Sequence, residues 1–173
     1  KRDQGEMLLG TETDSQDIEG QVLSTLPCDL VTAARLQECM DGLVGDSYQI
    51  PPMVSAIKKD GVPLYKLARK GQTVEREPRL IHVYRFRLLD FDLPRATFDV
   101  ACGKGTYVRT LCHDIGRKLG CGACLKALRR TASGRMDVAD ALPLDQILAL
   151  DGEALAARII SCVQYLGSKR SST

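Results

Sequence analysis

Hydrophobic residues recur at helical spacing in two segments of the chain. The first, residues 32–44, follows Thr32 as a candidate N-cap and stops before Gly45, whereas the second runs from Thr106, its candidate cap, to Gly120. The apolar faces would be formed by Leu36, Cys39, Met40 and Leu43 in the first segment and by Val108, Leu111, Cys112, Ile115 and Leu119 in the second. Both segments are therefore predicted to be amphipathic helices.

The stretches between these helices have the composition of strands. We expect a short strand over residues 53–59, and a helix between Pro63 and Gly71. Long strands over residues 79–91 and 96–102 would pair antiparallel across the 92–94 connection. The expected faces are Leu80, Tyr84, Phe86 and Leu88 against Ile81 and Val83 in the first long strand, and Ala96, Phe98, Val100 and Cys102 against Thr97, Asp99 and Ala101 in the second.

The last third of the chain is less regular. Residues 125–138 are compatible with a helix or a strand followed by a turn at Ser133-Gly134, and Pro143 opens a region of short helices that reaches Ile160. We expect one α+β unit over residues 1–167, with a mixed, largely antiparallel sheet and flanking helices. Residues 168–173 are expected to form a disordered tail.

The composition is that of an ordinary globular protein. The 173 residues are 44% hydrophobic and 27% charged, and no apolar run approaches the ~20 residues that a membrane-spanning helix needs. We therefore expect a cytoplasmic protein with no membrane partner. Its seven cysteines are expected to be reduced and mainly in the core, because the single CxxC pair, Cys121-Gly-Ala-Cys124, has no second CxxC to complete a zinc site. No metal is expected.

Charge is concentrated in two basic blocks. Residues 58–87 carry nine basic and three acidic side chains, and residues 103–135 carry eight and one, whereas residues 1–57 carry three and ten. Basic blocks of this kind attract nucleic acid by releasing its counterions. They are equally compatible with two solvated faces on exposed elements.

The Gly103-Lys-Gly-Thr106 turn, at a predicted strand-to-helix junction, could bind phosphate through free backbone N–H groups. A structural role, as a tight turn only, is the alternative. Tyr107 and Arg109 follow at once, and these side-chain types are suited to stacking on a base and to pairing with a carboxylate or phosphate.

Three ordered motifs resemble the TruB-type tRNA pseudouridine synthase family. They are Cys102-Gly-Lys-Gly-Thr-Tyr-Val-Arg-Thr-Leu111 followed by Asp114–Gly120 and Leu128-Arg-Arg130; Gln49-Ile-Pro-Pro-Met-Val-Ser-Ala-Ile-Lys58 with Gly61, Tyr65, Ala68-Arg69 and Gly71; and Gly10-Thr-Glu-Thr-Asp14 with Asp17 and Gly20. The resemblance covers approximately residues 1–150. It implies part of a pseudouridine synthase catalytic domain.

The family isomerises uridine 55 in the TΨC loop of tRNA to pseudouridine without a cofactor, after extruding the base from its stack. The resemblance implies that Tyr107 lies against the flipped base, that Arg109 pairs with the catalytic aspartate and that Leu128 forms a pocket wall. Eight further side chains are expected to contact RNA: Lys58, Tyr65, Arg69, Lys104, Thr106, Lys126, Arg129 and Arg130.

Two departures from the family pattern change the expectation. The nucleophilic aspartate lies in a GxLDPxAxG-type loop that would precede Lys1, and no such string occurs in the chain, so the chain alone is predicted to be inactive. Asp3 stands where the family pattern has a second active-site tyrosine. We also expect the family's small C-terminal RNA-binding module to be absent, and Arg109 to be solvent-exposed or re-paired with another group.

Three functions are therefore open. The first is a tRNA pseudouridine synthase represented by a fragment, which an N-terminal segment or a second chain completes. The second is a non-catalytic RNA-binding module that keeps the basic blocks and Tyr107. The third is a phosphate-ligand protein that uses the Gly103–Thr106 turn.

Overall fold

The computed structural model describes residues 1–59 and 61–167, and the expected tail at 168–173 lies outside them. The chain packs as two compact units, one over Lys1–Val138 and the other from Ala139 onward. The sequence predicts one unit over residues 1–167, whereas the structure divides between Val138 and Ala139. The candidate site residues all belong to the first.

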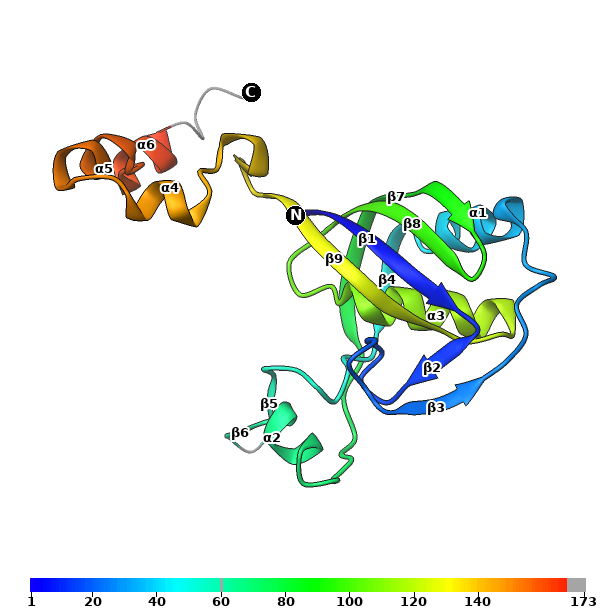
Figure 1. Ribbon diagram of the computed structural model, residues 1–173. Helices are drawn as coiled ribbons and strands as arrows, with labels where there is room; N and C mark the ends of the chain where they lie inside the picture. The colour runs from blue at the N-terminus through cyan, green and yellow to red at the C-terminus, as the bar shows by residue number, and fades with distance from the viewer. Residues whose placement is uncertain (60, 168–173) are drawn as a thin grey trace. The chain divides into compact units, whose positions relative to one another are not determined.

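The first unit is built on a six-stranded sheet with the order β10-β9-β1-β8-β7-β4, in which every neighbouring pair is antiparallel (Figure 1). The strands are β1 Arg2–Leu9, β4 Gly45–Gln49, β7 Arg79–Asp92, β8 Arg95–Cys102, β9 Ala123–Ser133 and β10 Met136–Asp137. The expected α+β class with a largely antiparallel sheet is confirmed, and so is the hairpin that joins β7 to β8.

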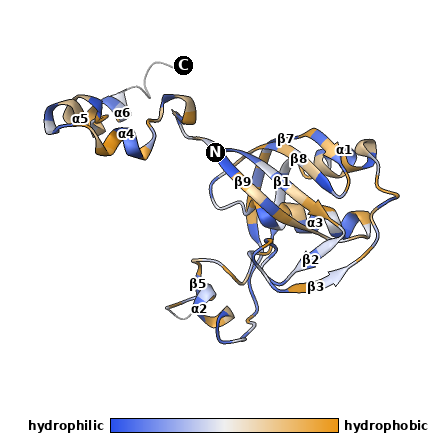
Figure 2. Cartoon of the chain, viewed as in Figure 1, coloured by the Kyte–Doolittle hydropathy of each residue, from blue (hydrophilic) through white to orange (hydrophobic). Residues whose placement is uncertain are grey.

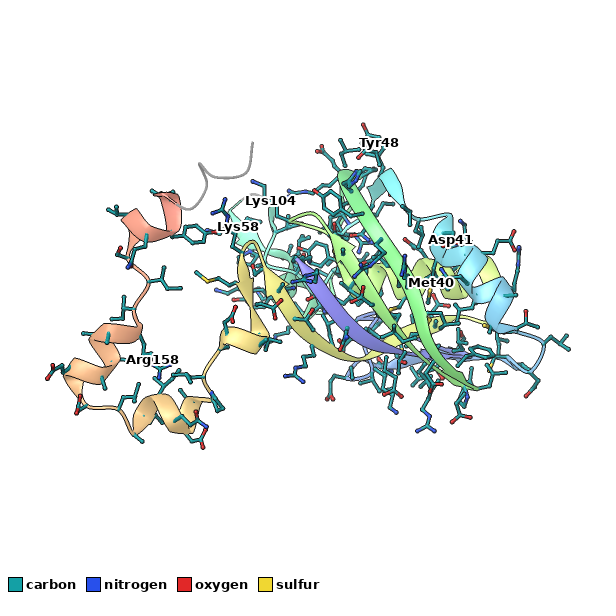
Figure 3. The ribbon with its side chains drawn as sticks, turned by 90° about the horizontal axis from the view of Figure 1, so that it is seen from above. Met40, Asp41, Tyr48, Lys58, Lys104 and Arg158 are labelled. Atoms are coloured by element: carbon teal, nitrogen blue, oxygen red, sulfur yellow. The ribbon has the colours of Figure 1, made fainter. Side chains whose placement is uncertain are left out.

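Two helices, α1 (Ala33–Asp41) and α3 (Val108–Leu119), pack their apolar faces into one core with the sheet. Both were expected from hydrophobic spacing. Met40 points from α1 toward the sheet, whereas Tyr48 on the edge strand β4 points into solvent (Figure 3). Thr32 caps α1 as predicted, since its side chain accepts a hydrogen bond from Arg35 N, and Gly120 ends α3 in the left-handed conformation.

Smaller elements surround this core. β2 (Thr11–Thr13) pairs with β3 (Val22–Thr25), and β5 (Lys58–Lys59) pairs with β6 (Val62–Pro63) ahead of α2 (Leu64–Ala68). The second unit holds three short helices, of which the third lies beyond the helical region that the sequence predicts up to Ile160. They are α4 (Leu144–Leu148), α5 (Gly152–Arg158) and α6 (Cys162–Gly167), after a 3₁₀ turn at Val138–Asp140 that joins the two units.

The expected faces of β7 are wrong. Leu80 and Tyr84 are 62% and 64% exposed, whereas Ile81, Val83 and Phe86 are buried. The cause is a register shift between Val83 and Arg85 against β8. One extra residue in a strand moves every later side chain to the other face, so no strict alternation could describe this strand.

The expected strand over 53–59 is also wrong for its first half. Residues 53–56 form bends, with Ser55 N–H donating to Met53 O at 2.9 Å and Tyr65 N–H donating to Ser55 O at 3.0 Å. The segment therefore folds back onto the start of α2, and strand pairing begins only at Lys58. The ambiguous stretch that follows residue 125 lies in β9.

β1 is a central strand that sequence patterning did not predict. Its first residues are polar and its last three, Met7 to Leu9, are apolar, while β9 runs the other way from an apolar start to a basic end. Figure 2 shows this change of polarity along both strands. Because the two strands are antiparallel, their polar ends meet at one end of the sheet, and that end carries the cleft described next.

Candidate functional site

A cleft of about 440 Å³ opens between the start of α3, the first residues of the chain and β9. Its wall contains five of the residues singled out in the sequence: Thr106, Tyr107, Arg109, Leu128 and Arg130. The remaining lining residues are Lys1, Asp17, Gly105, Val108 and Leu125. Residues from four distant parts of the chain thus meet at one opening.

The α3 end of the cleft is shaped by the glycine-rich turn. Gly103 N–H donates to His82 O at 2.8 Å, and Gly105 has a φ of +84°, a conformation that disfavours other residues. The helix N-cap is Tyr107, which corrects the expectation of Thr106. Thr106 is instead buried, and its backbone oxygen accepts a 2.6 Å hydrogen bond from Lys1 Nζ.

Tyr107 is held at this position by a buried amide. Its N–H donates to Gln49 Oε1 at 2.8 Å, and its carbonyl oxygen accepts from Gln49 Nε2 at 3.1 Å. Gln49 belongs to the motif that carries the family resemblance, but sequence reasoning gave it no role. Its place in that motif, two residues before the Pro51-Pro52 pair, was the available signal. Only the structure shows that its side chain is 3% exposed and that both polar atoms of the amide have partners.

Arg109 is the second residue of α3 and also lines the cleft. Its Nη2 donates to Val54 O at 2.5 Å, and its guanidinium carbon lies 5.8 Å from the centre of the Tyr107 ring. The expectation that Arg109 is exposed or re-paired is confirmed, since a backbone carbonyl is its partner. A guanidinium held by one carbonyl keeps further N–H donors for an anion.

The opposite wall contains an ion pair between a buried carboxylate and a half-exposed guanidinium. Asp3 on β1 is fully buried, and its Oδ1 accepts a 2.8 Å hydrogen bond from Arg130 Nε on β9. The α-amino group of Lys1 donates to Cys102 O at 3.0 Å. Burial raises the pKa of the Cys102 thiol, and the Lys1 ammonium opposes that rise. The walls therefore carry the cations of Lys1, Arg109 and Arg130.

The other six predicted RNA-contacting residues are not among those lining this cleft. Lys58 lines a separate cavity of about 160 Å³, whose wall also contains Arg76 and Arg79. The guanidinium carbon of Arg69 lies 5.6 Å from the centre of the Tyr65 ring. Lys126 is paired with Glu6 at 2.8 Å, Arg129 lies on β9 next to Leu128, and Lys104 is exposed on the glycine-rich turn (Figure 3).

Neither a metal cluster nor a membrane helix is found within residues 1–59 and 61–167. No group of three or more histidine, cysteine or acidic side chains there is arranged to hold a metal ion. In the same ranges, every helix is too short or too polar to cross a bilayer. All seven cysteines are free thiols; five are buried, Cys28 is half-buried and Cys162 is exposed.

Comparison with protein families gives two matches that together cover most of the chain. Residues 1–108 match the family described as TruB family pseudouridylate synthase, N-terminal domain. Residues 109–164 match the tRNA pseudouridylate synthase B C-terminal domain. This match corrects the expectation that the family's C-terminal module is absent. The junction between the two matches lies between Val108 and Arg109, at the cleft.

Two relatives named tRNA pseudouridine synthase B show the extent of the similarity. The protein of Opitutus terrae is 56% identical over 164 residues, which cover 95% of this chain and 68% of the relative. The protein of Syntrophotalea carbinolica is 48% identical over 160 residues, covering 92% of this chain and 52% of the relative. The chain thus spans between half and two thirds of the relatives' length.

The fold is also found in solved structures. A chain from the crystal structure of a Cbf5-Nop10-Gar1 complex superposes with a TM-score of 0.61 at 26% identity, covering 86% of this chain and 35% of that one. A chain from an H/ACA RNP bound to a substrate RNA containing 2'-deoxyuridine gives a TM-score of 0.57 at 21% identity, with 86% and 33% covered. The second likeness concerns the fold alone.

Proposed function

Because the chain belongs to the TruB family of pseudouridylate synthases, we propose that it is the catalytic-domain part of a tRNA pseudouridine synthase that isomerises uridine 55 in the TΨC loop. In that reaction the N-glycosidic bond of uridine breaks, the uracil turns, and a carbon-carbon bond to the ribose replaces it. No cofactor is required. For a protein that acts on tRNA we propose a cytoplasmic location.

The observation that carries this proposal is the meeting of Tyr107, Arg109 and Leu128 at one cleft. A base taken out of its stack needs an aromatic or apolar surface on which to lie, and Tyr107 and Leu128 supply one on facing walls. Arg109 beside the Tyr107 ring is placed to pair with a carboxylate.

The basic side chains around the opening support RNA as the partner. Lys104 lies on the turn beside the cleft, and Lys126, Arg129 and Arg130 belong to the strand that forms its other wall. The Thr106 side chain is buried, so it is not proposed to contact RNA. Lys58, Tyr65 and Arg69 belong to the β5-β6-α2 region, where they would meet a more distant part of the same RNA. Lysine and arginine at these places would contact phosphates, which position the RNA without reading its sequence.

The nucleophile is proposed to come from outside the 173 residues. No string in the chain matches the family's GxLDPxAxG loop, and Arg109 is bonded to the Val54 carbonyl rather than to a carboxylate. We infer that a segment carrying that aspartate completes the cleft, and that the chain alone is inactive. The aspartate would then take the free N–H donors of Arg109.

The second candidate is a non-catalytic RNA-binding module. The Arg109–Val54 contact favours it, because Arg109 is bonded there to a backbone carbonyl and not to a catalytic carboxylate. The deciding experiment measures pseudouridine formation in a synthetic TΨC stem-loop, with the chain alone and with the N-terminal segment of a full-length relative added. If the chain alone forms no pseudouridine and the chain with the added segment does, the synthase is supported. Salt-sensitive binding with no isomerisation in either case supports the module, and activity of the chain alone refutes the missing-nucleophile account.

A further inference from the structure

Gln49 makes a contact whose purpose the proposed function does not explain. It is the last residue of β4 and is 3% exposed, and both ends of its side-chain amide are used. Gln49 Oε1 accepts from Tyr107 N at 2.8 Å and Gln49 Nε2 donates to Tyr107 O at 3.1 Å, across 58 positions of sequence. The amide thus pairs with one residue as a neighbouring strand would.

This pairing fixes the backbone where α3 begins. The first N–H groups of a helix lack partners within the helix, and Tyr107 is an N-cap with an extended conformation, φ −95° and ψ 109°. Its carbonyl oxygen also accepts from Leu111 N at 3.2 Å inside α3. Tyr107 is therefore tied to β4 on one side and to its own helix on the other, which leaves its ring to face the cleft.

The segment that follows Gln49 holds the second residue of the site. Val54, five positions on, accepts the 2.5 Å hydrogen bond from Arg109 Nη2. Residues 49–54 thus contact Tyr107 through a side chain and Arg109 through a backbone carbonyl. A shift at Gln49 would move the ring and the guanidinium together, because both lie in the first turn of the same helix.

We propose that Gln49 is a positioning residue: its buried amide holds the backbone of Tyr107 so that the tyrosine ring and Arg109 stand ready at the cleft. This inference rests on the proposed function, in which Tyr107 lies against the extruded base. Gln49 itself lies outside the residues lining the cleft and acts through Tyr107. Positioning of this kind affects engagement of the base more than attachment of the RNA.

The chain offers a matched control in Gln37 on α1. Its Nε2 donates to Phe86 O at 3.1 Å and its Oε1 accepts from Leu88 N at 2.8 Å. These distances equal those of the Gln49 pair, but the bonds tie α1 to β7 instead of to the start of α3. Replacing Gln37 removes this pair of hydrogen bonds, and also the 2.8 Å bond from its Nε2 to Asp41 Oδ1, without touching Tyr107.

The test uses the 173-residue chain with Gln49→Ala, Gln49→Glu and Gln37→Ala. The first readout is the hydrogen-exchange rate of the Tyr107 amide in the free protein, and the second is quenching of 2-aminopurine placed at the target position of a TΨC stem-loop. For Gln49→Ala we expect Tyr107 exchange at least ~10-fold faster and a loss of quenching, with RNA affinity within about twofold of the unaltered chain. For Gln37→Ala we expect neither change.

Gln49→Glu tests the same proposal if the alanine variant does not fold. Its carboxylate still accepts from Tyr107 N–H but repels Tyr107 O, whereas the protonated acid can donate to that oxygen. Base quenching by this variant should therefore recover as the pH is lowered. A general packing defect would show no such pH dependence.

The outcomes separate the two proposals. Unchanged Tyr107 exchange and quenching in Gln49→Ala, or an equal effect of Gln37→Ala, overturns the positioning role. Absence of stem-loop binding by the unaltered chain, both alone and with the N-terminal segment of a full-length relative added, refutes the proposed function instead. The exchange rates then still decide whether Gln49 holds Tyr107 in place.

Discussion

Asp3 and Arg130 face each other across β1 and β9, with Arg130 Nε 2.8 Å from Asp3 Oδ1. The Asp3 side chain is fully buried, whereas the Arg130 side chain keeps 51% of its surface exposed. The resemblance described above leads us to expect a tyrosine at position 3, and the structure has there a carboxylate with its own cation. Arg130 is thereby committed to a partner inside the protein.

Removing Arg130 should be costly because it strands a buried charge. We expect Arg130→Ala to lower the free energy of unfolding by ~3 kcal/mol, and the added Asp3→Asn change to restore more than half of the loss. Urea denaturation measures both. Arg95→Ala, which breaks the exposed Arg95–Asp92 pair, should change the unfolding free energy by less than about 0.5 kcal/mol; equal losses in Arg95→Ala and Arg130→Ala would contradict the role of burial.

The two neighbouring arginines should differ in RNA binding. Arg129 is exposed, so Arg129→Ala should weaken binding to a TΨC stem-loop and reduce the slope of log K against log salt by about 1. The charge of Arg130 is offset by Asp3, so Arg130→Ala should reduce that slope by less. Affinities measured by anisotropy at several salt concentrations test the difference, and the reverse order would show that Arg130 leaves Asp3 to bind phosphate.

The contact between α3 and β9 depends on Gly116. A methyl group at this position would overlap the backbone nitrogen of Ala123, which rigid neighbours cannot relieve. We expect Gly116→Ala to destabilise the protein by ~1–3 kcal/mol. Gly103→Ala is the control, since the nearest atom to its methyl group would be His82 O at 3.6 Å, and a calorimetric melting temperature near that of the unaltered chain is expected for it.

The thiols should react in the order of their exposure. Cys162 is exposed, whereas burial raises the pKa of Cys112 and of Cys124 and so suppresses their thiolates at neutral pH. We expect Cys162 to react with a thiol reagent at least ~100-fold faster than these two, which require opening of the fold. Cys162→Ser should remove the fast phase, and a fast phase that survives this change would place another thiol at the surface.

Helices and strands with strong local signals could be predicted from the sequence. Hydrophobic spacing located α1 and α3, and Thr32 and Gly120 marked a start and an end because capping acts within one turn. The alternation in residues 96–102 gave the buried face of β8. The family motifs identified Tyr107, Arg109 and Leu128 as candidate site residues. A motif indicates which residues share a site but not their positions in space.

The central position of β1, the bulge in β7 and the N-cap of α3 could not be predicted, because each depends on contacts between residues far apart in the chain. β1, which contains Asp3, Gln4 and Gly5, has weak strand propensity and becomes central through pairing with β8 and β9 on both sides. The bulge in β7 is set by its partner strand and reverses the alternation that the sequence predicts. The sequence predicts Thr106 as the N-cap of α3, whereas the structure has Tyr107 there. The hydrogen bonds to Tyr107 come from Gln49, 58 residues away, and no local pattern predicts them.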